Sequence, residues 1–356
     1  MNKVQTVLGE IAPDDLGITL THEHLLIKSV EALWSEPTDP YKKQFVDQPV
    51  QMSNLGVIRR SPSISKDNLV MDDIDLAVGE VNEFKNAGGR SLVDVTTKGI
   101  GQNPEALVKI SKRTGLNVIA GTGYYVARSH PEDVKKKSVD QLTEQFVRDI
   151  TLGIDGSGVK SGLLGELGVS IKMTQEEENI LRAASRASLG TGCPISVHFT
   201  PPGREAFRAL EIFESEGVSL KRVNIGHLDT NSDIEYHKRI AERGSFISYD
   251  QFGLQYDDWE QVEGPEDFSG QSLNLEFPRD SERVRMIMEL CKAGFQDQIL
   301  LSQDVAEKVD LKFYGGHGYD HILRTIIPMF LKRGFSKSSI DKMLVDNPKK
   351  FLAFGV

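Results

Sequence analysis

The sequence contains only two cysteines among its 356 residues, Cys193 and Cys291, so it can form at most one disulfide. Both stand in apolar surroundings, which favours a reduced protein and predicts a cytoplasmic location. No apolar run approaches about 18 residues, so no membrane-spanning helix is expected. The N-terminal residues also lack a basic segment followed by an apolar stretch, so they predict no signal peptide.

Positive charge is scarce as well. The chain has 42 lysines and arginines against 52 aspartates and glutamates, a formal net charge of −10. Proteins that bind nucleic acids cluster lysine and arginine against the phosphate backbone. The single short basic run, residues 135–137, follows an acidic Pro-Glu-Asp and is interpreted as a solvated helix face. The charge therefore excludes a nucleic-acid partner and favours a small-molecule substrate.

Three common catalytic or cofactor motifs are missing. The glycine-rich pieces at residues 121–123, 155–158 and 315–318 match neither a dinucleotide fingerprint nor a phosphate-binding P-loop, and we interpret them as loops. No Gly-x-Ser-x-Gly stands at a strand-to-helix elbow, which argues against an α/β-hydrolase. The chemistry must therefore come from other residues.

The chain does contain a regular alternation of short β-like runs and longer amphipathic helical patterns. The expected helices include residues 73–87, 104–114, 175–191, 203–216, 231–243 and 280–294. The eight β-like runs begin near residues 17, 91, 117, 161, 194, 222, 245 and 298. Eight strands separated by helices predict an α/β fold, a distorted TIM (β/α)8 barrel formed by residues 1–356 as a single domain. A doubly wound open sheet is the alternative, but it usually has a glycine-rich turn after its first strand.

One long connection interrupts this pattern. Residues 28–70, rich in proline, serine and aspartate, are expected to form an irregular loop after the first strand. Because a long loop at a strand's carboxyl end often covers or shapes an active site, this segment is a candidate lid or interface.

Six metal-ligand side chains stand at the predicted carboxyl ends of the strands, where barrel enzymes place their chemistry. Residues i and i+2 of a strand share a face, so His22 and His24 point the same way. The full set is His22, His24, Glu166, His198, His227 and Asp304. Each alone has an ordinary structural interpretation, but unpaired buried imidazoles and carboxylates are costly, and their clustering calls for a cation. Six ligands exceed the need of one tetrahedral zinc and favour two divalent ions sharing a carboxylate.

These motifs together resemble the phosphotriesterase-related group of the amidohydrolase superfamily, over essentially the whole chain. They include Thr-His-Glu-His near the N-terminus, Gly-Glu-Leu-Gly, Val-His-Phe, Gly-His-Leu-Asp, Leu-Leu-Ser-Gln-Asp and Asp-Asn-Pro near the C-terminus. The resemblance implies that His22, His24 and Asp304 hold the more buried ion, and that His198 and His227 hold the more exposed one. It also implies that Glu166 bridges both ions, as in the glutamate-bridged branch of the group.

The expected metal is zinc, with manganese or cobalt as alternatives. A water between two divalent ions loses its proton near neutral pH, and Asp304 is predicted to orient it and carry its proton to the leaving group. Glu23, between the two histidines, is expected to face the barrel wall.

Substrate residues are predicted less directly. Tyr125 matches a tyrosine that the resemblance places beside the metals, and Gln251 stands where related enzymes carry histidine or arginine. Lys98, Arg128 and Arg279 are expected on loops at the barrel mouth, where a cation could meet an anionic group, although solvated surface charge is the competing interpretation. Asp229, two residues past His227, is interpreted as a residue that supports the metal ligands or acts on the leaving group. His317 and His321 have the i, i+4 spacing of a helical metal pair, but a substrate-loop or capping role is favoured over a third metal.

We therefore predict a metal-dependent hydrolase of carboxylic esters or lactones, including sugar and sugar-phosphate lactones, with side activity on phosphate or phosphonate esters. A native phosphotriesterase or an amide hydrolase is the alternative with the same metals. A non-catalytic metal-binding barrel is the alternative of another class. A homodimer is also among the expectations.

Overall fold

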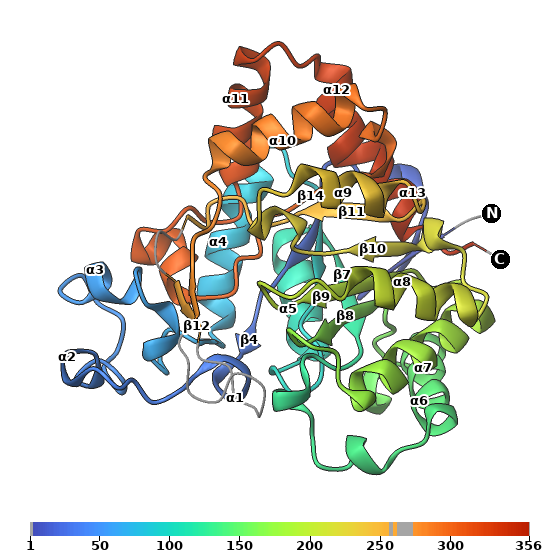
Figure 1. The fold of residues 1–356 in the computed structure, drawn as a ribbon, viewed down its shortest axis with the longest axis horizontal. Coiled ribbons are helices and arrows are strands. Elements are labelled where there is room, and N and C mark those ends of the chain that lie inside the picture. Colours follow the sequence, from blue (N-terminus) through green and yellow to red (C-terminus); the bar gives the residue numbers. More distant parts are fainter. Residues whose placement is uncertain (1–2, 256–258, 262–272, 356) are drawn as a thin grey trace.

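The computed structural model describes residues 3–255, 259–261 and 273–355. Eight parallel strands form a nearly closed barrel surrounded by helices (Figure 1), so the predicted fold is confirmed. Every predicted strand is present. In sheet order they are β3 (Thr19–Glu23), β6 (Ser91–Asp94), β7 (Asn117–Thr122), β8 (Leu163–Val169), β9 (Ile195–Phe199), β10 (Val223–Ile225), β11 (Phe246–Tyr249) and β14 (Ile299–Leu301).

The first and last strands, β3 and β14, meet at their carboxyl ends. The backbone N–H of His22 donates to Ser302 Oγ at 2.9 Å, and the N–H of Asp304 donates to the carbonyl of His22 at 3.2 Å. Two stretches of chain separated by about 280 residues are therefore held side by side where the ligand-type residues stand.

The predicted helices agree closely with the observed ones, because their caps are encoded locally. In the longest, Thr174 and Glu177 form a capping box, and Gly192 ends the helix with a φ of 74°. The helices are α1 (Val30–Leu33), α2 (Pro40–Lys43), α3 (Leu55–Ile58), α4 (Ile74–Asn86), α5 (Pro104–Thr114), α6 (Val139–Thr151), α7 (Gln175–Thr191), α8 (Ala206–Ser215), α9 (Ile234–Ala241), α10 (Asp280–Lys292), α11 (Ile327–Lys332), α12 (Lys337–Asp341) and α13 (Asn347–Leu352).

The segment 28–70 is more ordered than expected. It contains the short helices α1 to α3 and is closed by antiparallel pairing of β4 (Ile27–Lys28) with β5 (Val70–Met71). In Figure 1 its helices α2 and α3 lie to one side of the barrel, in blue. Asn68 anchors the segment to the chain after β14, since its carbonyl and its Oδ1 accept the backbone N–H groups of Lys308 and Val309, each at 3.0 Å.

Two small hairpins complete the described strands. The first, β1 (Val4–Thr6) with β2 (Gly9–Ile11), was not anticipated from the sequence, and the second pairs β12 (Trp259–Gln261) with β13 (Leu273–Leu275). A β-bridge between Lys3 and Phe354 brings the two chain ends together (Figure 1).

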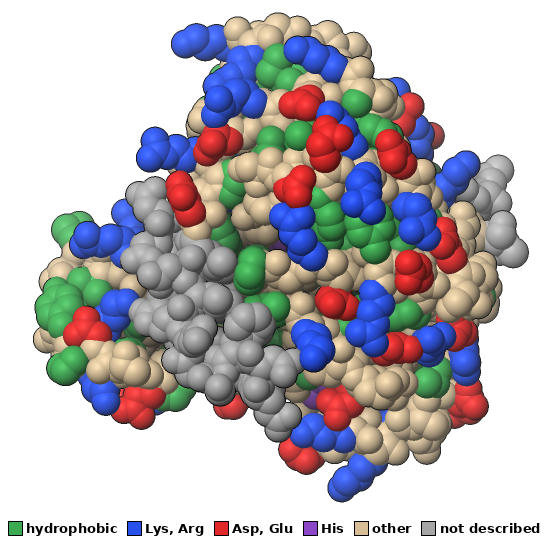
Figure 2. All heavy atoms as spheres, in the orientation of Figure 1, with side chains coloured by type: hydrophobic (Ala, Val, Ile, Leu, Met, Phe, Trp, Pro, Cys, Tyr) green, Lys and Arg blue, Asp and Glu red, His purple; other side chains and the backbone are tan. Residues whose placement is uncertain are grey.

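The distribution of surface charge and the state of the two cysteines agree with what the composition predicts. On the face drawn in Figure 2, acidic and basic side chains are interspersed among the described residues. Cys193 is buried and Cys291 half-buried, and both are free thiols. A search of the described helices finds none that is long and apolar enough to cross a membrane.

Candidate metal centre

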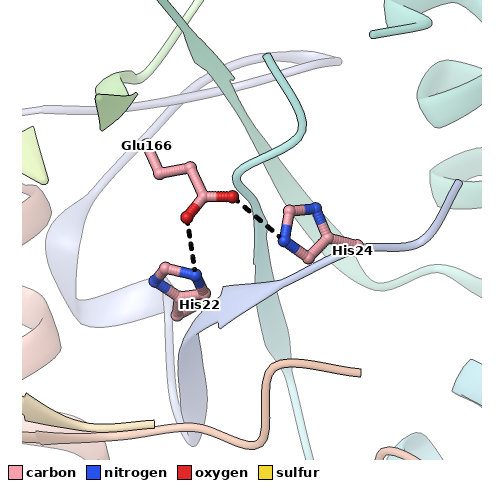
Figure 3. Close-up of side chains that lie close together, drawn as sticks. All are labelled: His22, His24 and Glu166. Carbon is pink, nitrogen blue, oxygen red and sulfur yellow. Dashed lines mark ion pairs between the residues drawn. The ribbon is translucent and has the colours of Figure 1, made fainter. Parts of the chain in front are cut away.

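Two imidazoles and one carboxylate meet at the carboxyl end of the barrel. Figure 3 shows His22 on β3 and His24 directly after that strand, both pointing toward Glu166 of β8, whose carboxylate lies between the two rings. Glu166 Oε2 is 3.2 Å from His22 Nε2, and Oε1 is 3.2 Å from His24 Nε2. The predicted same-face projection of the His-x-His pair is confirmed, and each carboxylate oxygen faces a different ring.

The other three predicted ligands join the same cluster. Asp304 Oδ1 is 3.3 Å from His24 Nε2, His198 Nδ1 is 3.2 Å from Glu166 Oε2, and His227 Nε2 is 3.8 Å from that oxygen. The ligand atoms form three groups, each within 4.8 Å, and Glu166 belongs to two of them. The groups are His22–His24–Glu166, His22–His227–Asp304 and Glu166–His198–His227.

The donor set fits divalent ions. Both ring nitrogens of His22 and Oε2 of Glu166 are buried and, although His22 Nε2 lies 3.2 Å from Glu166 Oε2, none of the three atoms forms a hydrogen bond with acceptable geometry. Native proteins rarely leave such groups unsatisfied, because the desolvation cost is not recovered. Imidazole nitrogens with carboxylate oxygens are the ligands that zinc and similar ions take.

The electrostatics of the cluster also call for added positive charge. Burial by itself lowers the pKa of His24, but Asp304 and Glu166 outweigh it and raise that pKa to about 10. Burial opposes ionisation of Glu166 too, yet His22 and its neighbours hold the pKa of Glu166 well below its usual range. The raised pKa values of His22, His24 and His227 thus reflect carboxylate charge that a metal ion would balance instead.

Residues behind the cluster fix the rings. Asp250 Oδ1 accepts from His227 at both the backbone N–H, at 3.0 Å, and Nδ1, at 2.9 Å. Thr96 Oγ1 lies 2.8 Å from His24 Nδ1. Such outer partners orient metal-binding histidines and set their tautomer. Sequence reasoning missed both residues, although the position of Asp250 at the end of the run 245–250 was an available signal.

Glu23 faces away from the cluster, as predicted, and braces the loop that carries Asp304. Its Oε1 accepts the N–H of Gln303 at 2.9 Å, and its Oε2 accepts the N–H of Val305 at 3.0 Å. Burial raises the pKa of Glu23 to about 8. Asp304 has a φ of 52° and His227 a φ of 56°, backbone conformations that are uncommon for non-glycine residues and that often accompany functional sites.

Two of the four predicted substrate residues lie at the cluster. The hydroxyl of Tyr125 is 3.2 Å from His198 Nε2, and Gln251 Nε2 donates to Asp304 Oδ2 at 2.7 Å. Both side chains line the cavity above the ligand-type residues, which we call the catalytic pocket. Counted together with the open space at its mouth, this pocket encloses about 710 Å³.

Lys98 and Arg279 are not brought to this pocket. Lys98 Nζ contacts Asp155 and lies 3.4 Å from Asp149 Oδ2 in a separate cleft, also lined by Tyr124 and Lys137, which we call the Lys98 cleft. Arg279 is exposed at the N-cap of α10.

The remaining polar candidates take structural positions. Asp229 accepts the N–H groups of Asp250 and Gln251 and lies 2.9 Å from the buried Arg283, so it supports the end of β11. His321 Nε2 lies 2.7 Å from Asp280 Oδ2 and stacks edge-on against His317. Arg128 donates to the carbonyl of Trp34.

The sequence analysis did not anticipate two carboxyl groups in the pocket wall. Glu307 and Asp310, which follow β14, both line the catalytic pocket and are 6% and 5% exposed. Burial, together with Asp310, raises the pKa of Glu307 well above its usual range, and burial raises the pKa of Asp310 to about 7.

Comparison with known proteins adds independent findings. The sequence model of the Phosphotriesterase family matches residues 2–352. A protein of Xenopus tropicalis named N-acetyltaurine hydrolase is 36% identical over 357 residues, covering 99% of this chain and 98% of that protein. A resiniferatoxin-binding protein from Rhodobacter sphaeroides has a TM-score of 0.92 at 36% identity, covering 98% of this chain and 94% of that one. A lactonase from Listeria monocytogenes has a TM-score of 0.78 at 27% identity, covering 99% and 100%.

Proposed function

Because this chain belongs to the phosphotriesterase family of hydrolases, we propose that it uses two divalent metal ions to cleave the amide bond of a small N-acylated amine. The observation that carries the metal dependence is the convergence of four imidazoles and two carboxylates with unpartnered buried atoms. The choice of an amide rests on the relatives named N-acetyltaurine hydrolase, which match over nearly their whole length. The ester or lactone preference expected from the sequence is not confirmed by those names.

In this proposal, His22, His24 and Asp304 would hold one ion, His198 and His227 would hold the other, and Glu166 would contribute to both sites. Zinc suits this donor set, and manganese or cobalt could replace it. When bound, the two ions would make hydroxide available near neutral pH and polarise the carbonyl of the substrate.

The protein residues supply orientation and proton transfer. The two oxygens of Asp304 have different surroundings, since Oδ1 faces His24 and Oδ2 accepts from Gln251. Gln251 therefore holds Asp304 in one rotamer, from which it accepts the proton of the attacking water and delivers it to the leaving nitrogen. An amine leaves only after protonation, so Asp304 has a larger part here than in ester cleavage. Tyr125 is positioned to donate to a substrate oxygen.

A lactone is the second candidate substrate, because the solved lactonase is similar over its whole length and shares the barrel. Lactones react through the same tetrahedral centre and need no protonated nitrogen to leave.

The test is metal analysis followed by a substrate panel. We expect about two zinc, manganese or cobalt ions per chain, and fewer than one would contradict the two-metal proposal. The metal-loaded protein is then assayed with acetamides of small amines, lactones, an aryl acetate and a phosphotriester. The proposal is supported if an acetamide is cleaved with a higher kcat/KM than the lactones and the phosphotriester. Lactone cleavage without amide cleavage selects the second candidate, and no cleavage at full metal occupancy selects a non-catalytic barrel.

A further inference from the structure

The catalytic pocket has an uneven distribution of charge. Beside the metal-centre residues, its wall is largely apolar, with side chains such as Leu33, Leu254 and Phe277. The other ionisable side chains in the wall are the carboxyl groups of Glu307 and Asp310. Among the described residues, no lysine or arginine lines this pocket.

The basic residues that could have supplied a positive charge are engaged elsewhere. Lys98 lies in its own cleft between Asp149 and Asp155. The charge of Arg59 acts on Asp310, and both residues line a neighbouring cavity. Arg59 does not line the catalytic pocket, however; it is exposed and donates to the carbonyl of Tyr314 at 3.0 Å. The two internal ranges outside the description, 256–258 and 262–272, contain five acidic residues and no lysine or arginine.

Glu307 and Asp310 are held in the wall by neutral partners. Asn68 Nδ2 donates to Glu307 Oε2 at 3.2 Å, and the N–H of Glu307 donates to Asp310 Oδ2 at 3.1 Å. In the described part of the chain, neither carboxyl group forms an ion pair with lysine or arginine. The wall therefore offers an ammonium or hydroxyl group carboxyl oxygens that can accept its hydrogen bonds, and it offers a sulfonate or carboxylate no lysine or arginine to pair with.

We propose that the catalytic pocket selects acylated amines whose amine portion carries a neutral or cationic end group and rejects those ending in a sulfonate or carboxylate, with Glu307 and Asp310 as the specificity-determining residues. This rests on the proposed amide hydrolysis. It separates the chain from its relatives named for N-acetyltaurine, whose amine portion ends in a sulfonate. The apolar wall accommodates the acyl group or a short alkyl linker, and the acidic wall receives the end group.

Three acetamides of equal length test the proposal: N-acetyltaurine, N-acetylethanolamine and N-acetylethylenediamine, with anionic, neutral and cationic ends. We expect kcat/KM for the neutral and cationic compounds to exceed that for N-acetyltaurine at least 10-fold, which corresponds to about 1.4 kcal/mol of transition-state stabilisation. Each compound is also measured as a competitive inhibitor of aryl acetate hydrolysis, where the inhibition constants should follow the same order.

The two readouts separate the possible failures. If the compounds inhibit in the expected order but are not cleaved, amide hydrolysis is wrong and the charge selectivity stands. If N-acetyltaurine is the best substrate or the tightest inhibitor, the charge selectivity is wrong whether or not amides are cleaved. These outcomes come from the unaltered protein and need no variant to fold.

Variants then assign the selectivity to residues. Glu307→Gln and Asp310→Asn should each reduce kcat/KM for the cationic compound several-fold relative to the neutral one. Asp155→Asn removes an acidic side chain in the Lys98 cleft and is the matched control. It should leave the ratio of kcat/KM for the cationic compound to that for the neutral compound unchanged. Arg59→Gln tests the competing source of specificity. Loss of N-acetyltaurine cleavage in that variant alone would mean that Arg59 recruits anions and would overturn the proposal.

Discussion

In the Lys98 cleft a buried carboxylate faces a lysine, whereas in the metal centre the buried carboxylates face imidazoles. Asp149 Oδ2 lies 3.4 Å from Lys98 Nζ and accepts from Thr122 Oγ1 at 2.7 Å. Glu166 has His22, His24 and His198 around it, and its Oε2 has no hydrogen-bond partner. Both regions concentrate polar side chains, but only the cleft contains a permanent cation.

This difference shows how a structural ion cluster can be told from a site that requires a ligand. A lysine keeps its proton at neutral pH and balances its carboxylates without help. Imidazoles balance carboxylates only while protonated, so a divalent ion can replace those protons and bind tightly. The comparison predicts that metal removal affects one region and leaves the other unchanged.

The largest expected effect comes from Asp304→Asn. The amide keeps the shape of the side chain but cannot accept a proton, so kcat on an aryl acetate or acetamide should fall about 1,000-fold or more. Asp155→Asn in the Lys98 cleft is the control and should keep kcat within twofold. A rate within about 10-fold of the unaltered protein would remove Asp304 from the mechanism.

Chelation is expected to have the next largest effect. Binding stabilises the folded state by about 4 kcal/mol when free metal is 1,000 times its Kd, so stripping the metal should lower the melting temperature clearly. Calorimetry before and after chelation measures the change. Lys98→Met should show the same fall as the unaltered protein, while Glu166→Gln should show little. Equal falls in all three proteins would mean that the chelator acts elsewhere.

Asp250→Asn should weaken metal binding without touching a ligand. Asp250 holds the ring of His227, and loss of such a partner typically costs 10-fold to 100-fold in metal affinity. Competition with a chromogenic chelator measures the affinity. The exposed Asp75→Asn on α4 is the matched control. Unchanged affinity would show that backbone geometry alone orients His227.

The smallest expected effect is that of Lys98→Met, which should lower the free energy of unfolding by about 1–3 kcal/mol and leave metal content unchanged. The loss should also depend on pH. Burial raises the pKa of Asp149 above its usual value, and Lys98 counteracts that rise. Removing the lysine therefore raises the folded-state pKa of Asp149 further.

The sign of that dependence follows from proton binding. Where the folded state holds its proton more tightly than the unfolded state, stability falls as pH rises through that range. At pH 8 the ionised carboxylate of Asp149 therefore lowers the free energy of unfolding more in the variant than in the unaltered protein. This difference disappears at a pH below the pKa of about 3.8 that the group has in the unfolded state. Urea unfolding at pH 8 and at pH 4 should show the larger loss at pH 8. Exposed Lys66→Met is the control and should change little at either pH.

Much of the fold and of the metal-ligand set could be predicted from local sequence patterns. The helix α7 was readable from its capping box and its terminal glycine, and the side-chain alternation of β3 placed His22 and His24 on one face. Parallel strands that close into a barrel bring their carboxyl ends to one rim, so Glu166 and Asp304 were expected near those histidines. Residues that are not themselves metal ligands were harder to place. Thr96 reaches His24, and Glu307 reaches the pocket, through loops whose paths depend on packing.

Lys98 shows most clearly what could not be predicted from the sequence. By sequence it follows β6 just as the ligand-type residues follow their strands, yet its side chain lies in another cleft because Asp149 and Asp155, brought there by α6 and the chain after it, hold its charge. The sequence by itself determined the barrel and the residues able to hold metal, since strand periodicity and strand-end position are local properties. Only the tertiary structure decided which charges meet, because ion pairing and pocket lining depend on residues far apart in the chain.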